Sequence, residues 1–168
     1  MCLETNCRNL ETSKPHTGLS DAAREQIARA LHGSLEAALS LMLDTQLSHW
    51  NVVGPLFKPI HDLTEEHYNN LFEAADEIAE RFRALGHPVN IAKHSPAPSN
   101  ERVSAGARSA VAMIRDLASS HEDIVREYRK AALMADDNRD FVTHELIVQR
   151  MAFHEKALWM LSATLADQ

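Results

Sequence analysis

Five side chains of the kinds that bind transition metals lie close together in the sequence. They are two imidazoles and three carboxylates: His49, His61, Glu65, Asp76 and Glu80. This mixture suits Fe(II) better than Cu(I) or structural zinc, which favour sets of thiolates. The sequence therefore predicts an iron site in this part of the chain.

Four of these residues share one face of a predicted helix but cannot meet on it. Six residues of this face follow one another at spacings of 4, 4, 3, 4 and 4 residues: His61, Glu65, Asn69, Phe72, Asp76, Glu80. Such spacings keep side chains on one side of a helix. At a rise of about 1.5 Å per residue, Glu65 and Asp76 lie roughly 16 Å apart. Metal ligands lie within about 2.0–2.2 Å of the ion, so one copy of the helix cannot complete a site.

The spacing is palindromic, which suggests how a site is completed. If two copies pair antiparallel about a two-fold axis between residues 70 and 71, His61 meets Glu80 of the partner subunit. Glu65 then meets Asp76 of the partner subunit. Two-fold pairing is the commonest oligomer symmetry, and it would create two identical sites at once.

Two further residues on this face would lie at the contact between the two paired subunits, which we call the seam. One more candidate ligand comes from the preceding helix. In this pairing Asn69 would meet Phe72 of the partner subunit, so both would lie where the two molecules touch. His49 precedes a short loop that contains Gly54 and Pro55. Because a short loop makes antiparallel neighbours of the helices it joins, His49 can return beside His61.

The alternative interpretation is an ordinary solvated helix face. Charged residues four apart are common on such a face, and Glu80 with its neighbour Arg81 can be ordinary surface residues without a binding role. His121 and His154 fall on apolar stripes without carboxylates. We interpret these two as hydrogen-bonded core histidines.

Four long amphipathic segments are expected to position these residues. The first is capped by Ser20, runs to about Trp50, and has an apolar residue at every fourth position: Ile27, Leu31, Leu35, Leu39, Leu43, Leu47. The second runs from Pro59 to the residues before Gly86, which ends it. The third and fourth cover about residues 107–134 and 138–165, the fourth capped by Asp137 or Asn138.

Four helices without a strand pattern predict an all-α four-helix bundle. The long connection, residues 87–103, contains Pro88, Pro96 and Pro98 and is expected to hold one short helix. It lies between the second and third helices. Such a crossover lets these two helices run parallel, which is the ferritin-like arrangement.

Composition limits the class of protein. The 168 residues have a net charge of −7 and 45% hydrophobic residues, as expected for a globular domain whose surface does not attract nucleic acid as a whole. No apolar run reaches the ~18 residues of a membrane helix. We expect a flexible tail at residues 1–19, a single domain at 20–168, and a cytoplasmic location. Cys2 and Cys7 lie in the tail, and we interpret them as incidental thiols.

Several stretches resemble the Dps family, the DNA-binding proteins from starved cells, or miniferritins. They are HWNV at residues 49–52, DEIAERFRALGHP from residue 76, DFVTHEL at 140–146 and HEKALWML at 154–161. Single positions are also similar: Gly54, Phe57, His61 and Tyr68. The resemblance implies a hollow shell of twelve subunits, with di-iron ferroxidase sites at the two-fold interfaces.

The positions of the family's iron ligands, transferred to this sequence, agree with the palindromic spacing of the candidate ligands. His49, His61 and Glu65 come from one subunit, and Asp76 and Glu80 from the other, Glu80 bridging two irons. Glu65 stands where many members have Asp, and its longer side chain can alter occupancy of the weaker iron position. A conventional ferritin uses Glu-x-x-His motifs within one bundle, and this sequence contains none.

The resemblance also implies a reaction. Fe(II) is oxidised by hydrogen peroxide, or more slowly by dioxygen, and the Fe(III) is stored as mineral, which protects DNA from oxidative damage. Paired irons deliver two electrons to one peroxide, so hydroxyl radical is avoided. Trp50, beside His49, is either an electron donor to a stray oxidant or a packed interface aromatic.

Acidic residues near the start of the fourth helix are candidates for an iron-entry pore. Asp140 and Glu145 lie where the family's three-fold pore carries carboxylates, and Asp136 and Asp137 are nearby. Acidic pores concentrate cations. The alternative for Asp137 or Asp140 is helix capping.

Two other functions stay open at this point. One is a nucleoid-binding stress protein whose main role is DNA binding. The other is a metal-buffering or peroxide-resistance protein that acts on zinc, manganese or copper, which competition among divalent metals for the site would reveal.

We predict weak or no DNA binding at physiological salt. Family members that bind DNA often use a Lys-rich tail, whereas here Arg8 and Lys14 are balanced by Glu4 and Glu11. Too few cations remain for contact with several phosphates. A gel shift at about 0.15 M salt measures this, and a strong, salt-sensitive shift would contradict it.

Overall fold

The computed structural model describes residues 16–91 and 108–166. These ranges form four long helices and no strand: α1 (Asp21–Asn51), α2 (Phe57–Ala84), α3 (Ala110–Asp137) and α4 (Phe141–Thr164). The all-α prediction is confirmed for this part of the chain. None of these four helices combines the length and apolar character needed to cross a membrane.

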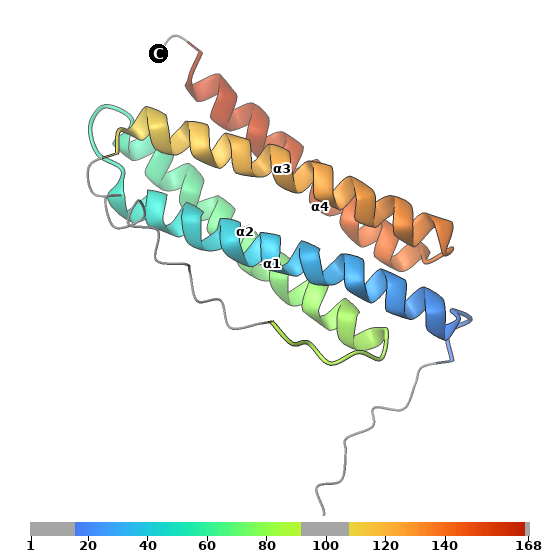
Figure 1. Cartoon of the computed structure of the whole chain (residues 1–168). Helices are drawn as coiled ribbons and strands as arrows, with labels where there is room; N and C mark the ends of the chain where they lie inside the picture. Colours follow the sequence, from blue (N-terminus) through green and yellow to red (C-terminus); the bar gives the residue numbers. More distant parts are fainter. Residues whose placement is uncertain (1–15, 92–107, 167–168) are drawn as a thin grey trace, which may run out of the picture.

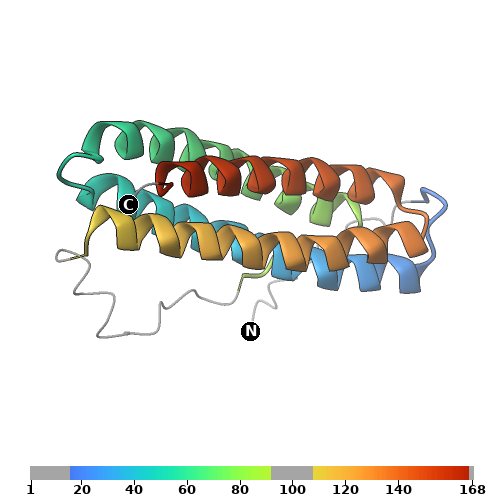
Figure 2. The same cartoon turned by 90° about the horizontal axis from the view of Figure 1, so that it is seen from above.

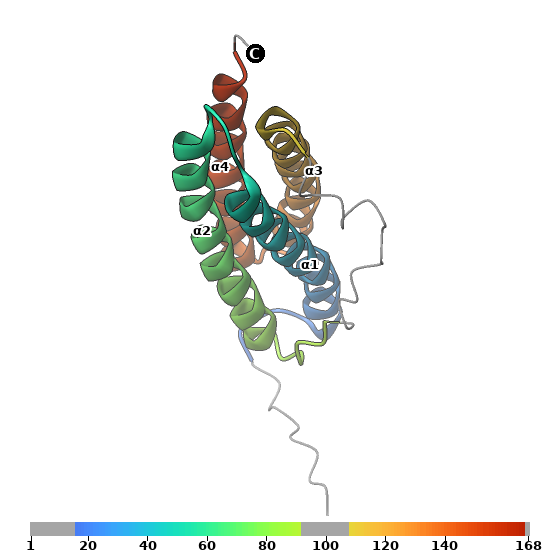
Figure 3. The same ribbon diagram turned by 90° about the vertical axis from the view of Figure 1, so that its left-hand side faces the viewer.

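The helices form a bundle in which α1 runs antiparallel to α2, and α3 runs antiparallel to α4 (Figure 1). Helix α1 packs against α2 and α3, and α4 packs against α3 and α2. Helices α2 and α3 run in the same direction (Figures 1 and 2), as a long crossover predicts. Figure 3 shows the four helices foreshortened, in an oblique view along the bundle. The short helix expected in the crossover and most of the expected tail fall outside the described residues.

Local signals fix three of the helix ends. Ser20 caps α1 by accepting a hydrogen bond from the Ala23 N–H at 3.1 Å. Ser109 caps α3 in the same way. After α2, Gly86 adopts a φ of 90°, the left-handed conformation that ends a helix at no steric cost for glycine. The predicted cap at Ser20 and stop at Gly86 are both confirmed.

The buried face of α1 departs from the predicted four-residue stripe. Ile27, Leu31 and Leu35 are buried, but Leu43 is 48% and Leu47 40% exposed. Each step of four residues turns about 40° past a full helical turn, so a strict four-residue stripe leaves the core after a few steps. The buried face continues instead through Ala38, Leu41, Thr45 and Ser48.

Helix α4 starts later than predicted. Asp137 is the last residue of α3 and Asn138 is its C-cap, so the prediction that one of them caps α4 is wrong. The N-cap is Asp140, whose carboxylate accepts a hydrogen bond from the Thr143 N–H at 3.1 Å. Between the helices, Arg139 has a φ of 57°, and this left-handed residue turns the chain.

Three histidines lie inside the bundle: His67 on α2, His121 on α3 and His154 on α4. They are 2%, 0% and 0% exposed. Nδ1 of His121 lies 2.9 Å from Nδ1 of His154, so the prediction of hydrogen-bonded core histidines is confirmed. The apolar pattern of the sequence did not predict that His67 lies with them.

We expect these histidines to make the fold sensitive to acid. Burial in the apolar interior lowers the pKa of His121 to about 3 and that of His154 to about 2, from 6.5. The unfolded chain takes up protons below pH 6.5 while the folded chain stays neutral, so stability is complete above that pH and is lost as the pH falls toward 3. The loss is about 1 kcal/mol per pH unit for each histidine.

Urea unfolding at pH 7 and pH 5 measures this effect. The wild-type midpoint should fall between the two values, and that of His121→Leu should fall less steeply because one titrating group is gone. His144→Gln, which removes a half-exposed histidine, is the control and should keep the wild-type slope. Equal slopes for wild type and His121→Leu would contradict the assignment.

Candidate metal centre

The end of α1 and the start of α2 hold two stacked imidazoles. The rings of His49 and His61 are nearly parallel, with an interplanar angle of 18° and centroids 3.8 Å apart. His49 Nδ1 lies 2.9 Å from the carbonyl oxygen of His61, and His61 Nδ1 lies 3.0 Å from the carbonyl oxygen of His49. The structure therefore places His49 beside His61, as the short loop predicts.

These two hydrogen bonds determine the tautomer of both rings. A carbonyl oxygen only accepts, so Nδ1 of each ring carries the proton and donates it. In the neutral imidazole, Nε2 is then left with its lone pair free. A metal-bound histidine has the same arrangement, with its other ring N–H held by a carbonyl or carboxylate. Tyr68 packs edge-on against His49, with centroids 5.3 Å apart, and further restricts the ring.

The three carboxylates stand on the solvent side of α2. Glu65, Asp76 and Glu80 are all exposed. Within the described ranges, none of them is engaged in a hydrogen bond or ion pair. By contrast, the Lys58 ammonium pairs with Asp62 on the same helix at 2.6 Å. The predicted ligands are thus carboxylates that no intramolecular contact occupies.

A single chain keeps its two sets of candidate ligands apart. The unbroken helix α2 runs from Phe57 to Ala84, so Glu65 and Asp76 remain roughly 16 Å apart. In the part of the chain that the structure describes, no three His, Cys, Asp or Glu side chains are arranged to hold a metal ion. The pairing of two subunits across this face stays a prediction.

The seam residues and Trp50 are exposed in the isolated chain. Phe72 is 66% and Trp50 64% exposed, and Asn69 is exposed beside Phe72 on the α2 face. Large apolar side chains on a surface are common where another molecule binds. Trp50 is not packed within its own chain, so its electron-donor role and its alternative role as an interface aromatic both stay predictions.

Asp140 has a structural role in the chain. It is 3% exposed, it caps α4, and its two oxygens accept from one Arg81 nitrogen at 2.7 and 2.8 Å. Burial alone would raise the pKa of Asp140, but the hydrogen bonds from Arg81 and Thr143 outweigh it and hold the pKa below its usual range. The capping alternative is therefore confirmed for Asp140.

The other candidate pore residues remain available at the surface. Asp136, Asp137 and Glu145 are exposed, and Glu145 accepts a hydrogen bond from the Gln149 side chain at 2.8 Å. Asp137 does not cap a helix start, because it ends α3. The pore role of all four acidic residues stays a prediction.

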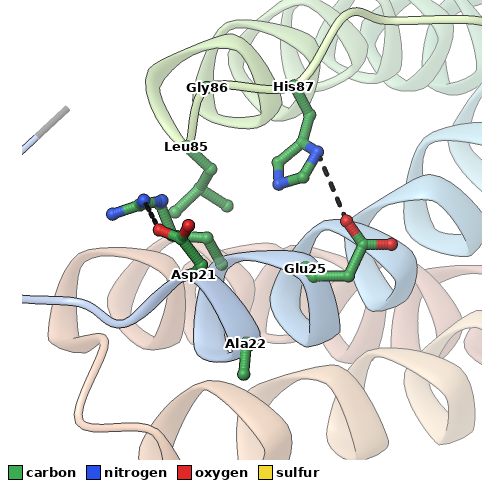
Figure 4. Close-up of a pocket in the computed structure, with 7 residues that line it drawn as sticks. Asp21, Ala22, Glu25, Leu85, Gly86 and His87 are labelled. Carbon is green, nitrogen blue, oxygen red and sulfur yellow. Dashed lines mark hydrogen bonds and ion pairs between the residues drawn. The ribbon is translucent and has the colours of Figure 1, made fainter. Parts of the chain in front are cut away.

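A cleft at the opposite end of the bundle offers no comparable set of ligands. It has a volume of about 360 Å³ and lies between the start of α1 and the end of α2 (Figure 4). The polar groups that line it pair with one another: Arg24 with Asp21, and His87 with Glu25 at 3.6 Å. The candidate ligands His49, His61, Glu65, Asp76 and Glu80 lie elsewhere, at the end of α1 and along α2.

Comparison with known proteins agrees with this fold. A family model described as a ferritin-like domain matches residues 28–168. A low temperature-induced protein of Nostoc sp. is 34% identical over 154 residues, which cover 90% of this chain and 86% of the relative. The DNA protection during starvation protein of Brevibacillus brevis is 32% identical over 118 residues, which cover 70% of this chain and 79% of the relative.

Solved structures give the same result. The structure of Dps from Thermosynechococcus elongatus matches with a TM-score of 0.75 and 29% identity, over 88% of this chain and 94% of that one. The helix order and the family match together define a ferritin-like protein. Within that class, the chain belongs to the Dps family.

We expect Asp140→Ala to destabilise the fold strongly. The substitution removes the cap of α4 and leaves the Arg81 guanidinium without its buried partner, which typically costs about 3–5 kcal/mol. Glu145→Ala, at an exposed position on the same helix, is the matched control and should stay within about 0.5 kcal/mol of wild type. Urea unfolding at neutral pH measures both. Equal stability of the two variants would show that Asp140 is not a structural residue.

Proposed function

We propose that this protein is an iron-storing ferroxidase whose active sites are shared between two subunits. Its substrates are Fe(II) and hydrogen peroxide, or more slowly dioxygen, and the Fe(III) product is stored as mineral inside a shell of twelve subunits. Membership of the Dps family supports a ferritin-like function in iron storage. Protection of DNA from oxidative damage would follow from removing the two substrates that generate hydroxyl radical.

The observation that carries this proposal is the stacked pair of imidazoles at the start of the helix that bears the exposed carboxylates. His49 and His61 hold their Nε2 lone pairs free through reciprocal hydrogen bonds. Glu65, Asp76 and Glu80 lie on the same helix as His61 and are exposed. Nitrogen and oxygen ligands of this kind suit iron, and carboxylates stabilise Fe(III) more than Fe(II).

The proposed roles follow from position. His49, His61 and Glu65 bind iron from one subunit, and Asp76 and Glu80 bind it from the other, Glu80 bridging two irons. Two Fe(II) ions each give up one electron. One hydrogen peroxide takes both electrons together with two protons and yields two waters, so no radical is released.

Charge supports the supply of substrate. The chain carries a net charge of −7, and Asp136, Asp137 and Glu145 lie exposed around the α3–α4 corner. Acidic surfaces and pores concentrate cations such as Fe(II). The same negative charge opposes contact with DNA phosphates, so we favour iron oxidation over DNA binding as the main role. We also propose a cytoplasmic location.

Complementation between two inactive variants tests whether the site is shared. His49→Ala/His61→Ala lacks one half of each site, and Asp76→Ala/Glu80→Ala lacks the other. Each alone should oxidise Fe(II) at least tenfold more slowly, since losing even outer partners of a metal site costs about 10–100-fold. When the two variants assemble at random in equal amounts, about half of the dimers contain one copy of each. In such a mixed dimer, one site receives both intact halves and the other receives both mutated halves. About a quarter of the wild-type number of sites should therefore return.

The measurement is Fe(III) absorbance after mixing anaerobic Fe(II)-protein with peroxide. Co-expression of the two variants, with the native mass confirming assembly, provides the mixed dimers. No recovery in mixed protein would overturn the shared site. Phe72→Glu, which changes the seam and no ligand, should lower dimer content and rate together, whereas the adjacent Glu73→Gln should change neither.

A further inference from the structure

Two aromatic rings contact the stacked imidazoles of the candidate metal centre. Phe57 lies over His61, with ring centroids 5.0 Å apart and an interplanar angle of 31°. Tyr68 packs edge-on against His49. Because His49 and His61 stack directly on each other, the contacts form one continuous series, which we call the ring row: Phe57, His61, His49, Tyr68.

Helix α2 supplies three of the four rings at helical spacings. Phe57 lies four residues before His61, and Tyr68 lies seven residues after it, so all three fall on one side of the helix. His49, near the end of α1, contacts the rings of both His61 and Tyr68. The ring row therefore joins the two helices that provide the candidate nitrogen ligands.

The start of α2 lacks the local support that the other helices have. Its N-cap residue, Leu56, makes no side-chain hydrogen bond, and its first turn contains no acidic residue. The other three helices each have a side chain that caps their start: Ser20, Ser109 and Asp140. The first N–H groups of a helix have no partner within the helix, and helix ends without caps fray. The candidate ligand His61 stands one turn after this uncapped start.

A tight turn before α2 places Phe57 where it can support that turn of helix. Gly54 has a φ of 87°, a left-handed conformation that glycine adopts without steric cost. Its carbonyl oxygen accepts a hydrogen bond from the Phe57 N–H at 3.0 Å. The side chain of Phe57 is 43% exposed, so burial in the core does not account for an aromatic residue here. Its ring instead covers the imidazole of His61.

Contacts on the ring faces restrict a motion that the hydrogen bonds allow. Nδ1 of His61 donates to the carbonyl oxygen of His49, which determines the tautomer but leaves the ring able to tilt about this single bond. Aromatic pairs prefer stacked or edge-to-face arrangements, and such a contact corresponds to a factor of about 2–10 in an equilibrium constant. The row therefore favours one direction of each Nε2 before an ion binds, which is how a metal centre is preorganised.

We propose that Phe57 and Tyr68 are positioning residues of the metal centre, which hold the imidazoles of His61 and His49 in their binding orientation. This inference rests on the proposed function and adds two residues to it. Phe57 has no atom that can bind a metal, so its effect on the centre comes through His61. Because the imidazoles bind Fe(II) before it is oxidised, loss of positioning should raise the KM for Fe(II) more than it lowers kcat.

Oxidation of Fe(II) by excess peroxide tests the role of Phe57. Phe57→Leu keeps an apolar side chain without the ring, and it should raise the KM for Fe(II) about 3–10-fold with kcat within about twofold of wild type. Phe57→Tyr, which keeps a ring over His61, should restore the wild-type KM. A loss of folded protein would instead lower kcat and leave KM unchanged, so an unchanged KM in Phe57→Leu would overturn the proposal.

The matched control is Phe141→Leu. Phe141 is the first residue of α4, as Phe57 is the first residue of α2, and it is also exposed. This variant should keep the wild-type KM. Tyr68 is tested in the same assay: Tyr68→Leu should raise the KM, whereas Tyr68→Phe, which keeps the edge-on ring, should not. An equal KM for Tyr68→Leu and wild type would remove Tyr68 from the proposal.

Crystal structures of the metal-free protein test positioning without any activity. His61 should have a single ring orientation in the wild type, with Nδ1 at the His49 carbonyl oxygen, and more than one orientation in Phe57→Leu. One unchanged orientation in both proteins would overturn the proposal. If the wild type oxidises no Fe(II) but Phe57→Leu still loosens the His61 ring, the proposed function fails while the positioning of the imidazoles stands.

Discussion

A straight α-helix cannot bring together residues eleven positions apart, and the organisation of this protein depends on that limit. Helix α2 carries His61 and Glu65 toward one end and Asp76 and Glu80 toward the other, with an unbroken helix between them. An ion that needs both groups must therefore be held by two chains. The limit makes Phe72 and Asn69, which bind nothing themselves, as important to the proposed chemistry as the ligands, because they lie where the two helices would cross.

Surroundings set the role of one residue type in this bundle, as its stacked and its buried histidines show. His49 and His61 each donate to the other's backbone carbonyl, so their tautomers are fixed and each Nε2 keeps a free lone pair. His121 and His154 have only each other and the core around them. Burial keeps these interior rings neutral. The same residue type is thus a candidate ligand at the end of the bundle and a core side chain inside it.

Asp140 illustrates the same point for carboxylates. From sequence it is one of several acidic residues at the α3–α4 corner, suited to a pore or to a cap. Its role is decided by Arg81, which lies 59 residues earlier and reaches it across the bundle. Because Arg81 follows Glu80 on α2, this ion pair also ties the helix end that carries two candidate ligands to the start of α4.

By itself, the sequence determined the features that depend on short-range chemistry. Four helices, the cap at Ser20, the stop at Gly86 and the ligand spacing on α2 all follow from residues within a few turns of one another. Only the tertiary structure decided which helix faces are covered. Leu43 and Leu47 continue a regular apolar pattern yet are exposed, since none of the four described helices covers that side of α1. His67 lies two residues from Glu65, an exposed candidate ligand, and yet is buried, because residues of α3 and α4 pack against its side of α2. Burial and long-range partners depend on contacts between distant segments, which local periodicity does not encode.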